Sequence, residues 1–272
     1  MEKWTFDNFR PTQGEKLWTE RKKMNTFYRE YIPCEELQEY VVCYWVSKTI
    51  NISGESISSR VIPDGCMDMV FNMKEIREGK SGVISGIMTR ASEEENKEIN
   101  EFIGVRFWPG GIIPFIKSSA GDFTNQLVSL DNILGIMSLE LNEKLHLASS
   151  VIERLTIVEQ ELKEILLKAK TRDVIIIKAI NSIYKKRGVQ SVKELSKELN
   201  ISQRQLSRKF NDWIGISPKK FLNIIKFQHV VLTFNNNEDV DIQRLILEAG
   251  YYDQAHFIKE FKAFYGKTPG RL

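Results

Sequence analysis

Residues 191–272 contain one pattern twice, and this duplication restricts the possible folds more than any other feature of the chain. A shift of 51 positions places Gly215 on Gly266 and Pro218 on Pro269. The same shift pairs apolar positions, namely Leu195 with Ile246, Leu206 with Phe257, Phe210 with Phe261 and Trp213 with Phe264. Two copies in one register indicate a single structural unit that has been duplicated.

The first copy predicts two helices separated by a short turn. Apolar residues recur at helical spacing over residues 192–199, and Asn200 suits the break that follows. Ser202 is placed to cap the second helix, and Gln205 completes a capping box with it. The copy therefore predicts a helix-turn-helix unit.

The second copy repeats this layout with different residues. Gly250 supplies the turn, and Asp253 is the expected N-cap of the final helix. Tyr252 and Phe257 stand at the two positions of a hydrophobic staple, so we expect their side chains to pack together.

A polar face remains on the second helix of each copy once the apolar positions are assigned to the core. In the first copy this face is cationic and free of carboxylates, and comprises Gln203, Arg204, Ser207, Arg208 and Asn211. The face of the second copy is also basic, and comprises Gln254, Ala255, Ile258, Lys259 and Lys262. Arg and Gln carry the donor groups that match guanine and adenine edges in a major groove. One such face is more often a solvated surface, but two in the same register favour DNA binding.

Residues 191–272 resemble the tandem helix-turn-helix domain of the AraC/XylS family of bacterial transcription regulators. The resemblance rests on Leu195, Ile201-Ser202, Leu206, Phe210, Gly215-Ile216-Ser217-Pro218, Ile246, Ala249-Gly250-Tyr251, Phe257, Phe261-Lys262 and Gly266-Lys267-Thr268-Pro269. In this family a long helix joins the two motifs, which enter successive major-groove segments on one face of DNA. Residues 217–234 match the joining helix, with Ser217 as cap and Pro218 at its first position.

The resemblance implies a transcription regulator whose partner is double-stranded DNA, with RNA polymerase as a further partner if the protein is an activator. We expect Arg204 and Arg208 to contact bases, assisted by Gln203 and Gln254. Phosphate contacts are expected from Lys259, Lys262 and His256.

The charge distribution along the chain agrees with a DNA-binding C-terminal domain. Residues 172–272 contain 18 Lys and Arg against 10 Asp and Glu, whereas residues 1–171 contain 21 against 26. A basic C-terminal half is expected of a domain that contacts phosphates. The chain shows no signal peptide and no apolar run long enough to span a membrane, which predicts a cytoplasmic protein with no membrane partner.

Strand and turn patterns dominate the chain before about residue 110. Runs rich in β-branched and aromatic residues lie at 40–50, 57–62, 67–73, 82–88 and 99–108. They predict a small antiparallel barrel or sandwich, so the expected fold class is α+β, with a helical connector and a C-terminal all-α domain. The expected divisions are an N-terminal arm at 1–23, a β-rich domain at 24–135, a connector at 136–171 and the DNA-binding domain at 172–272. The arm could pack on the barrel or contact the DNA-binding domain.

Residues 60–71 and 104–111 resemble the N-terminal sensor domain of one branch of AraC-like regulators. Four charged residues stand among strand-like apolar runs, and two tryptophans could supply apolar walls for a small polar or amphipathic effector. These candidate effector-binding residues are Trp45, Arg60, Asp64, Asp68, Arg106 and Trp108. The alternative is structural: Asp64 serves its turn, Asp68 pairs with an arginine and the tryptophans belong to the core.

The sequence gives no sign of catalysis, and we predict neither an enzyme nor a cofactor or metal. His146, His229 and His256 all lie outside the predicted barrel, and the three cysteines lack metal-ligand spacing. No nucleophile elbow, phosphate loop or dinucleotide fingerprint is present. Two rival hypotheses stay open: a regulator without effector, whose N-terminal domain is a protein-interaction or dimerisation module, and an enzyme fused to a DNA-binding domain.

A strong helix is predicted from Ser150 to about residue 170. Ser150 and Glu153 form the pattern of a capping box. Apolar residues then repeat with the spacing of a coiled-coil seam at Val151, Leu155, Val158, Leu162, Ile165 and Ala169. This stripe either forms a homodimer or packs on the protein's own β-rich domain.

Overall fold

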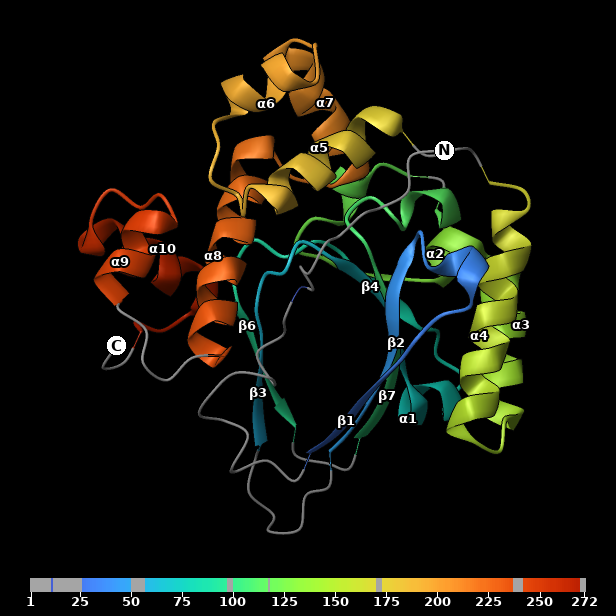
Figure 1. The fold of residues 1–272 in the computed structure, drawn as a ribbon. Helices are drawn as coiled ribbons and strands as arrows, with labels where there is room; N and C mark the ends of the chain where they lie inside the picture. Colours follow the sequence, from blue (N-terminus) through green and yellow to red (C-terminus); the bar gives the residue numbers. More distant parts are fainter. Residues whose placement is uncertain are drawn as a thin grey trace.

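The computed structural model describes Pro11 and residues 26–49, 57–96, 100–116, 118–169, 173–236 and 242–269. The expected N-terminal arm lies outside the described residues, Pro11 apart. Figure 1 shows strands in the centre, two long helices on one flank and the C-terminal helices above the strands and on the opposite flank. The α+β class, with a sheet before an all-helical C-terminal part, is therefore confirmed.

In the ranges that the structure describes, six strands form one antiparallel sheet in the order β1-β2-β7-β4-β5-β8. They are β1 (Thr26–Tyr31), β2 (Val41–Thr49), β7 (Asn100–Phe107), β4 (Met67–Asn72), β5 (Val83–Ser85) and β8 (Leu127–Ser129). Burial alternates along β4, where Met67, Met69 and Phe71 are buried. Because successive strand residues point to opposite faces, the intervening Asp68 and Val70 lie on the other face of the sheet.

Two further strands, β3 (Ile57–Val61) and β6 (Ser92–Asn96), pair only with each other and form a separate ribbon. In the described part of the chain the sheet and the ribbon are not hydrogen-bonded together, so the predicted barrel is not closed. Figure 1 shows the ribbon between the main sheet and the long C-terminal helix α8. The strand β6 was not predicted from the sequence, since three consecutive glutamates are poor strand formers.

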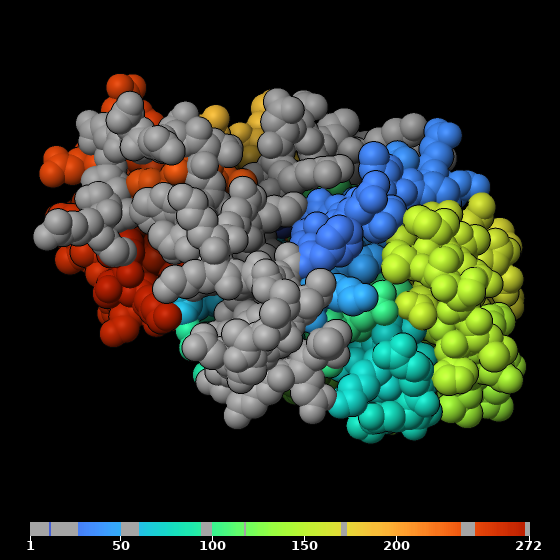
Figure 2. All heavy atoms as spheres, turned by 90° about the horizontal axis from the view of Figure 1, so that it is seen from below, coloured from blue at the N-terminus to red at the C-terminus, as the bar shows by residue number. Residues whose placement is uncertain are grey.

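Among the described residues, the α-helices of the N-terminal part are α1 (Met73–Arg77), α2 (Asp131–Leu134), α3 (Ile136–Leu147) and α4 (Val151–Leu166). The helix α4 packs against α3 and against the short 3-10 helix η3 (Ile113–Phe115). Figure 2 shows α3 and α4 together on one flank, far from the red C-terminal helices.

The apolar stripe of α4 is used inside the chain. Leu155, Val158 and Leu162 are buried, and the ion pair between Lys163 Nζ and Glu36 Oε1, at 2.9 Å, holds the helix to the start of the domain. These three residues of the stripe therefore pack on the chain's own domain, and a homodimer through the stripe stays a prediction. The capping box was half wrong, since Ser150 accepts the N–H of Glu153 but the Glu153 carboxylate accepts from Ser149.

The C-terminal domain consists of α5 (Val174–Lys185), α6 (Val192–Glu198), α7 (Gln203–Trp213), α8 (Pro218–Asn236), α9 (Ile242–Glu248) and α10 (Gln254–Tyr265). Aromatic side chains on α8 join its two halves. Phe221 packs on Phe210 of α7 with ring centroids 5.9 Å apart, and Phe227 packs edge-on against Phe261 of α10 at 5.5 Å. None of the described helices combines the length and apolar character needed to cross a bilayer.

Candidate nucleic-acid interface and ligand cavity

The first helix-turn-helix unit is built by local hydrogen bonds that the sequence predicts. Ser202 accepts the N–H of Gln205, whose side chain accepts the N–H of Ser202, so the expected capping box is confirmed. Asn200 adopts a left-handed conformation with φ of 54°, which ends α6 and turns the chain into α7. These bonds fix the direction in which α7 leaves the turn.

The predicted reading face of α7 is open to solvent. Leu206 and Phe210 are buried, while all residues of the predicted face are exposed, namely Gln203, Arg204, Ser207, Arg208 and Asn211. No acidic residue lies in the first turn of the helix, so its N-terminus is free to attract phosphate. Asn211, at the far end, also touches the N-terminal domain, because its backbone oxygen accepts a hydrogen bond of 3.3 Å from Ser119.

The second unit has the same layout with one correction. Gly250 turns the chain with φ of 71°, and Asp253 caps α10 by accepting the N–H of His256 at 2.7 Å. Tyr252, expected to pack on Phe257, is instead 88% exposed. Tyr251 takes that place, with its ring 5.2 Å from that of Phe257.

The candidate contacts of α10 form an exposed set, namely Gln254, His256, Lys259 and Lys262. Ile258, which was also assigned to this face, is instead half-buried against the core, while the polar residues of the predicted face point outward. The joining helix α8 begins at Pro218, as expected, and Ser217 accepts the N–H of Lys220 at 3.3 Å.

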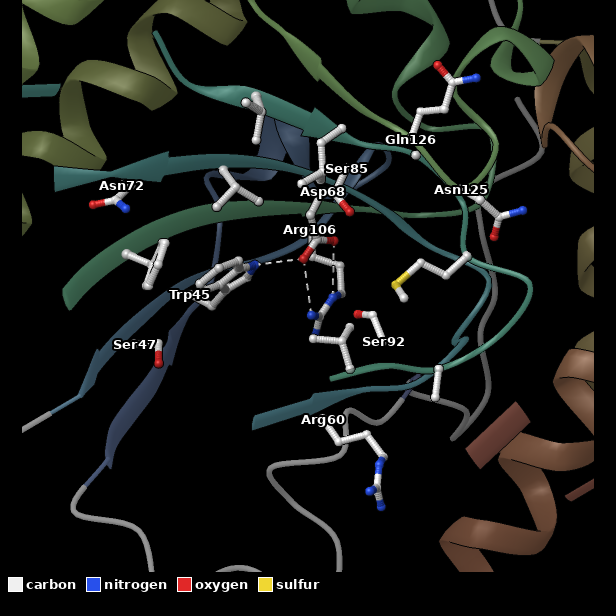
Figure 3. A pocket seen from close by; sticks show the side chains of 18 of the residues that line it. Trp45, Ser47, Arg60, Asp68, Asn72, Ser85, Ser92, Arg106, Asn125 and Gln126 are labelled. Atoms are coloured by element: carbon white, nitrogen blue, oxygen red, sulfur yellow. Dashed lines mark hydrogen bonds and ion pairs between the residues drawn. The ribbon is translucent and has the colours of Figure 1, made fainter. Parts of the chain in front are cut away.

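A cavity of about 570 Å³ lies on the face of the main sheet to which Asp68 points. Four of the candidate effector-binding residues line it: Trp45, Arg60, Asp68 and Arg106. Figure 3 shows Trp45 on one wall, Asp68 and Arg106 at the centre, and Asn125 and Gln126 at the other end. The cavity therefore has both apolar and polar walls, and its volume is typical of sites that bind small molecules.

The other two candidates lie outside the lining. Trp108 is buried in the core, where its indole N–H donates to the backbone oxygen of Gln38 at 3.1 Å. Asp64 lies behind Arg106, where its carboxylate accepts the N–H of Cys66 at 2.9 Å. Both places match the structural alternative for these residues.

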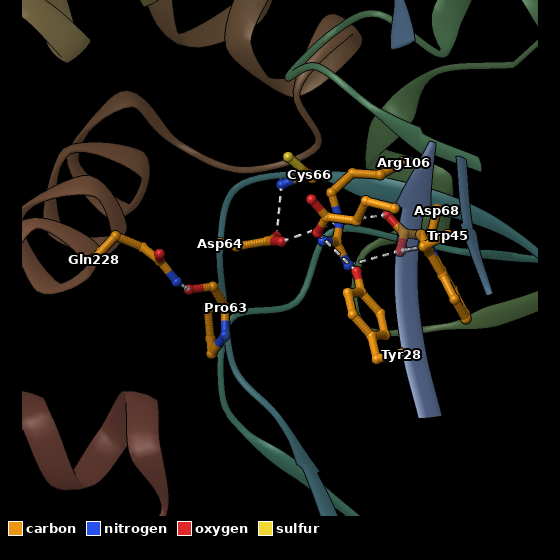
Figure 4. A network of polar contacts seen from close by, with 9 residues as sticks. Tyr28, Trp45, Pro63, Asp64, Cys66, Asp68, Arg106 and Gln228 are labelled. Carbon is orange, nitrogen blue, oxygen red and sulfur yellow. Dashed lines mark hydrogen bonds and ion pairs between the residues drawn. The ribbon is translucent and has the colours of Figure 1, made fainter. Parts of the chain in front are cut away.

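The centre of the cavity is a bonded network of charged side chains (Figure 4). Arg106 donates from Nη2 to Asp68 Oδ2 at 3.1 Å, and its Nε lies 3.6 Å from Asp64 Oδ2. Trp45 donates from its indole N–H to the same Asp68 oxygen at 2.9 Å. Each carboxylate is therefore oriented by at least two partners.

Burial and charge act against each other at this network. Burial alone would lower the pKa of Arg106, but the Asp68 and Asp64 carboxylates outweigh it and hold the pKa well above its ordinary value. Arg106 is therefore permanently charged. Burial, with a smaller contribution from Asp64, raises the pKa of the Cys66 thiol, so this cysteine is an unreactive core residue.

One wall of the cavity touches the second helix-turn-helix unit. The guanidinium of Arg60, on the ribbon strand β3, lies 4.8 Å from the ring centroid of Tyr265 at the end of α10 and forms an ion pair with Glu93 on β6. Lys267 also approaches Glu93, at 3.8 Å. The β3–β6 ribbon therefore lies between the cavity and α10.

A second connection leads from the network to the joining helix. The loop after β3 carries Asp64, and Gln228 of α8 donates to the Pro63 oxygen of this loop at 2.7 Å. Gly65 adopts φ of 85°, and a Cβ there would stand 2.9 Å from Phe221 of α8. The loop is thus bonded to Arg106 on one side and pressed against α8 on the other.

A third connection holds the end of α7. Thr124 donates from its hydroxyl to the backbone oxygen of Gly215 at 2.5 Å. Gly121 leaves room for the Asn211 side chain, which a Cβ would approach to 3.0 Å.

Sequence reasoning missed the residues that join the two parts of the chain. Gln228 had a usable signal, since it is a polar residue within an apolar-rich helical stretch; the structure shows that it is fully buried. Tyr265, Glu93 and Thr124 gave none, because their contacts depend on how distant segments pack. Tyr28, which lines the cavity beside Trp45, lies in the strand β1, which was not predicted.

Two family models match the chain. A helix-turn-helix domain model matches residues 195–272, and a model described as a domain of unknown function (DUF6597) matches residues 29–129. The C-terminal part is therefore a helix-turn-helix domain. With its duplicated motif and long joining helix, this domain is similar to the DNA-binding domain of the AraC/XylS family.

Curated relatives match less than a third of the chain. The HTH-type transcriptional regulator MtrA of Neisseria gonorrhoeae is 35% identical over 72 residues, which cover 26% of this chain and 24% of that protein. An uncharacterized HTH-type transcriptional regulator of Haemophilus influenzae is 29% identical over 80 residues, covering 29% of this chain and 26% of that protein. The match thus spans about a quarter of the length of these relatives.

Solved structures show a distant likeness over most of the chain. A crystal structure of ToxT from Vibrio cholerae O395 covers 91% of this chain and 96% of its own, with 12% identity and a TM-score of 0.39. A second structure of ToxT from Vibrio cholerae, at 1.65 Å resolution, covers 79% and 96%, with 13% identity and a TM-score of 0.41.

Proposed function

We propose that this chain is a sequence-specific DNA-binding transcription regulator that reads two adjacent major-groove segments with α7 and α10. The observation that carries the proposal is the duplicated helix-turn-helix unit with both polar helix faces exposed. Arg204 and Arg208 would read bases, assisted by Gln203 and Gln254. Lys259, Lys262 and His256 would hold phosphates, which fixes position rather than sequence.

The N-terminal domain would act as a ligand-controlled sensor. Its cavity shares Arg60 with the contact to α10, and its Arg106 reaches the loop that touches α8. A ligand that moves either residue would change how the DNA-binding domain is held. The partners are then double-stranded DNA and a small molecule, with RNA polymerase added if the protein is an activator.

The decisive experiment is selection of bound sequences from a random DNA pool with the full chain at stated salt. Two conserved blocks about one helical turn apart would support reading by both motifs. A repeat of the whole site would support a homodimer. Enrichment of no sequence at all would contradict the proposal.

Single substitutions separate base reading from phosphate contact. Arg204→Ala or Arg208→Ala should weaken binding to the selected site by about 1–3 kcal/mol and relax its sequence preference. Lys262→Ala should weaken binding to every sequence. The slope of the logarithm of the binding constant against the logarithm of the salt concentration should also become shallower, by the amount expected for about one lost phosphate contact. Electrophoretic mobility titrations on the selected and a scrambled site measure both effects.

The control is Arg77→Ala, which removes an exposed arginine from α1 of the N-terminal domain and should change neither quantity. If Arg204→Ala and Arg208→Ala both keep the preferred sequence and affinity of the wild type, the roles given to these residues are wrong.

A further inference from the structure

We propose that the cavity binds an organic cation, such as an amine or guanidine with an apolar part, whose charge lies beside Asp68 and the face of Trp45. The regulatory meaning of this ligand rests on the effector control proposed above, whereas its binding does not.

The bonded network at the centre of the cavity has an excess of negative charge. Two carboxylates, Asp64 and Asp68, surround the single guanidinium of Arg106, whose side chain is 7% exposed. An anionic ligand at Arg106 would be a third negative charge around one buried cation, which the weak screening there disfavours. A cation beside Asp68 would instead balance the network.

The remaining charges of the lining do not alter this balance. Arg60 lines the cavity, but its guanidinium pairs with Glu93 and stacks on Tyr265, and Figure 3 shows it pointing away from Asp68 and Arg106. Glu75 and Arg90 carry opposite charges, and the Arg90 side chain is exposed to solvent.

An aromatic wall stands next to the excess negative charge. Trp45 is fixed in place, since its N–H bonds to Asp68 and its indole lies over Gly104, where a Cβ would come within 2.1 Å of the ring. Tyr28 stacks beside it with ring centroids 6.4 Å apart. An aromatic face next to a carboxylate is the arrangement that recognises organic ammonium groups.

The size and polarity of the cavity suit a ligand with one charged end. A volume of about 570 Å³ exceeds the need of a bare ammonium ion and admits an apolar part. Val70, Val83, Met88 and Phe102 also line the cavity and would cover that part.

Three small probes of similar size test the sign of the preferred charge. Phenethylamine is a cation at pH 7, 2-phenylethanol is neutral and phenylacetate is an anion. Isothermal titration calorimetry with the full chain should show phenethylamine binding about tenfold or more tightly than 2-phenylethanol, and phenylacetate binding most weakly. Equal affinities, tighter binding of phenylacetate or no binding of phenethylamine would overturn the proposal.

Two matched substitutions locate the charge preference. Asp68→Asn should reduce the preference for phenethylamine over 2-phenylethanol to about one, whereas Glu75→Gln, at another carboxylate of the lining, should preserve it. Circular dichroism and thermal unfolding establish that each variant is folded. Should Asp68→Asn fail to fold, the relative affinities of the three probes for the wild type still decide whether the cavity prefers a cation.

The two proposals can fail separately. DNA selection needs no ligand, so its failure would leave the ranking of the probes intact. Conversely, a wrong ranking would refute the cation while a selected DNA site still supported the regulator. Addition of phenethylamine to the DNA titration then tests whether the ligand alters DNA affinity.

Discussion

Gly65 lies where the N-terminal domain packs against the joining helix α8. Its φ of 85° is a conformation that L side chains rarely adopt, and any Cβ would press on Phe221. Both constraints act at one position, so backbone strain and steric overlap must be separated by experiment.

Gly65→Ala should destabilise the protein more than Gly79→Ala. Gly79 has nearly the same φ, 80°, but nothing lies within 4 Å of the position of its Cβ. Its replacement therefore measures the backbone strain alone, about 1–2 kcal/mol. The overlap with Phe221 should add about 1–3 kcal/mol at Gly65. Urea titration of both variants measures the difference, and equal losses would show that the loop moves away from α8 without cost.

His229 on α8 should make stability depend on pH. Burial, together with the nearby Arg187, holds its pKa below the ordinary value of 6.5. The unfolded chain therefore binds more protons than the folded chain in the range below about pH 6.5, so the free energy of unfolding falls as the solution is acidified through that range.

Urea titrations at pH 7.5 and 5.5 measure this loss. His229→Gln should reduce it, whereas His146→Gln, at an exposed histidine on α3, serves as the control. A loss that persists unchanged in His229→Gln would assign the pH dependence to other groups.

At the scale of the elements, the helices of the second half follow from local chemistry. The capping box at Ser202, the turn at Gly250 and the cap at Asp253 are all made by residues within three positions of one another. Such features can be predicted from the sequence because no distant segment takes part in them.

Elements that depend on distant partners were harder to predict. The glutamate-rich β6 becomes a strand because it pairs with β3, and the stripe of α4 could have met a second copy as well as its own domain. Trp45 and Trp108 look alike in sequence, yet one lines the cavity and the other is in the core. The cavity was therefore predicted only in part, because a residue's face is set by tertiary packing.

Ser202→Ala should loosen α7 by removing its cap. Loss of an N-cap costs about 1 kcal/mol, and the reciprocal bond of Gln205 to the Ser202 N–H loses its geometry as well. Hydrogen exchange in the first turn of α7 should rise. Ser207→Ala, within the same helix, should leave exchange there unchanged or slower, since alanine is the better helix former. Equal exchange in the two variants would contradict a role for the cap.

At the scale of the whole molecule, the contacts between the described residues that hold the C-terminal domain against the N-terminal domain include the ribbon, the loop at residues 63–65 and the segment around Thr124. Each of these places adjoins the lining of the cavity, through Arg60, Arg106 and Asn125 respectively.

Tyr265→Leu should release the ribbon from α10. The stacking of Arg60 on this ring stabilises the contact by about 0.5–2 kcal/mol. Hydrogen exchange of the full chain should therefore increase in β3 and at the end of α10 and stay unchanged in α6. Tyr252→Leu removes a tyrosine that is 88% exposed and is the control. Unchanged exchange in β3 would show that Arg60 and Glu93 hold the ribbon without the ring.

The position of Arg60, between the cavity and α10, has a consequence for the affinity of the cavity. Binding free energies at two linked sites are reciprocal, so whatever factor a ligand applies to DNA affinity, DNA applies to ligand affinity. DNA bound by α10 would therefore change the affinity of the cavity for its ligand. Molecules of this protein on different DNA sequences would then respond to different concentrations of the same compound.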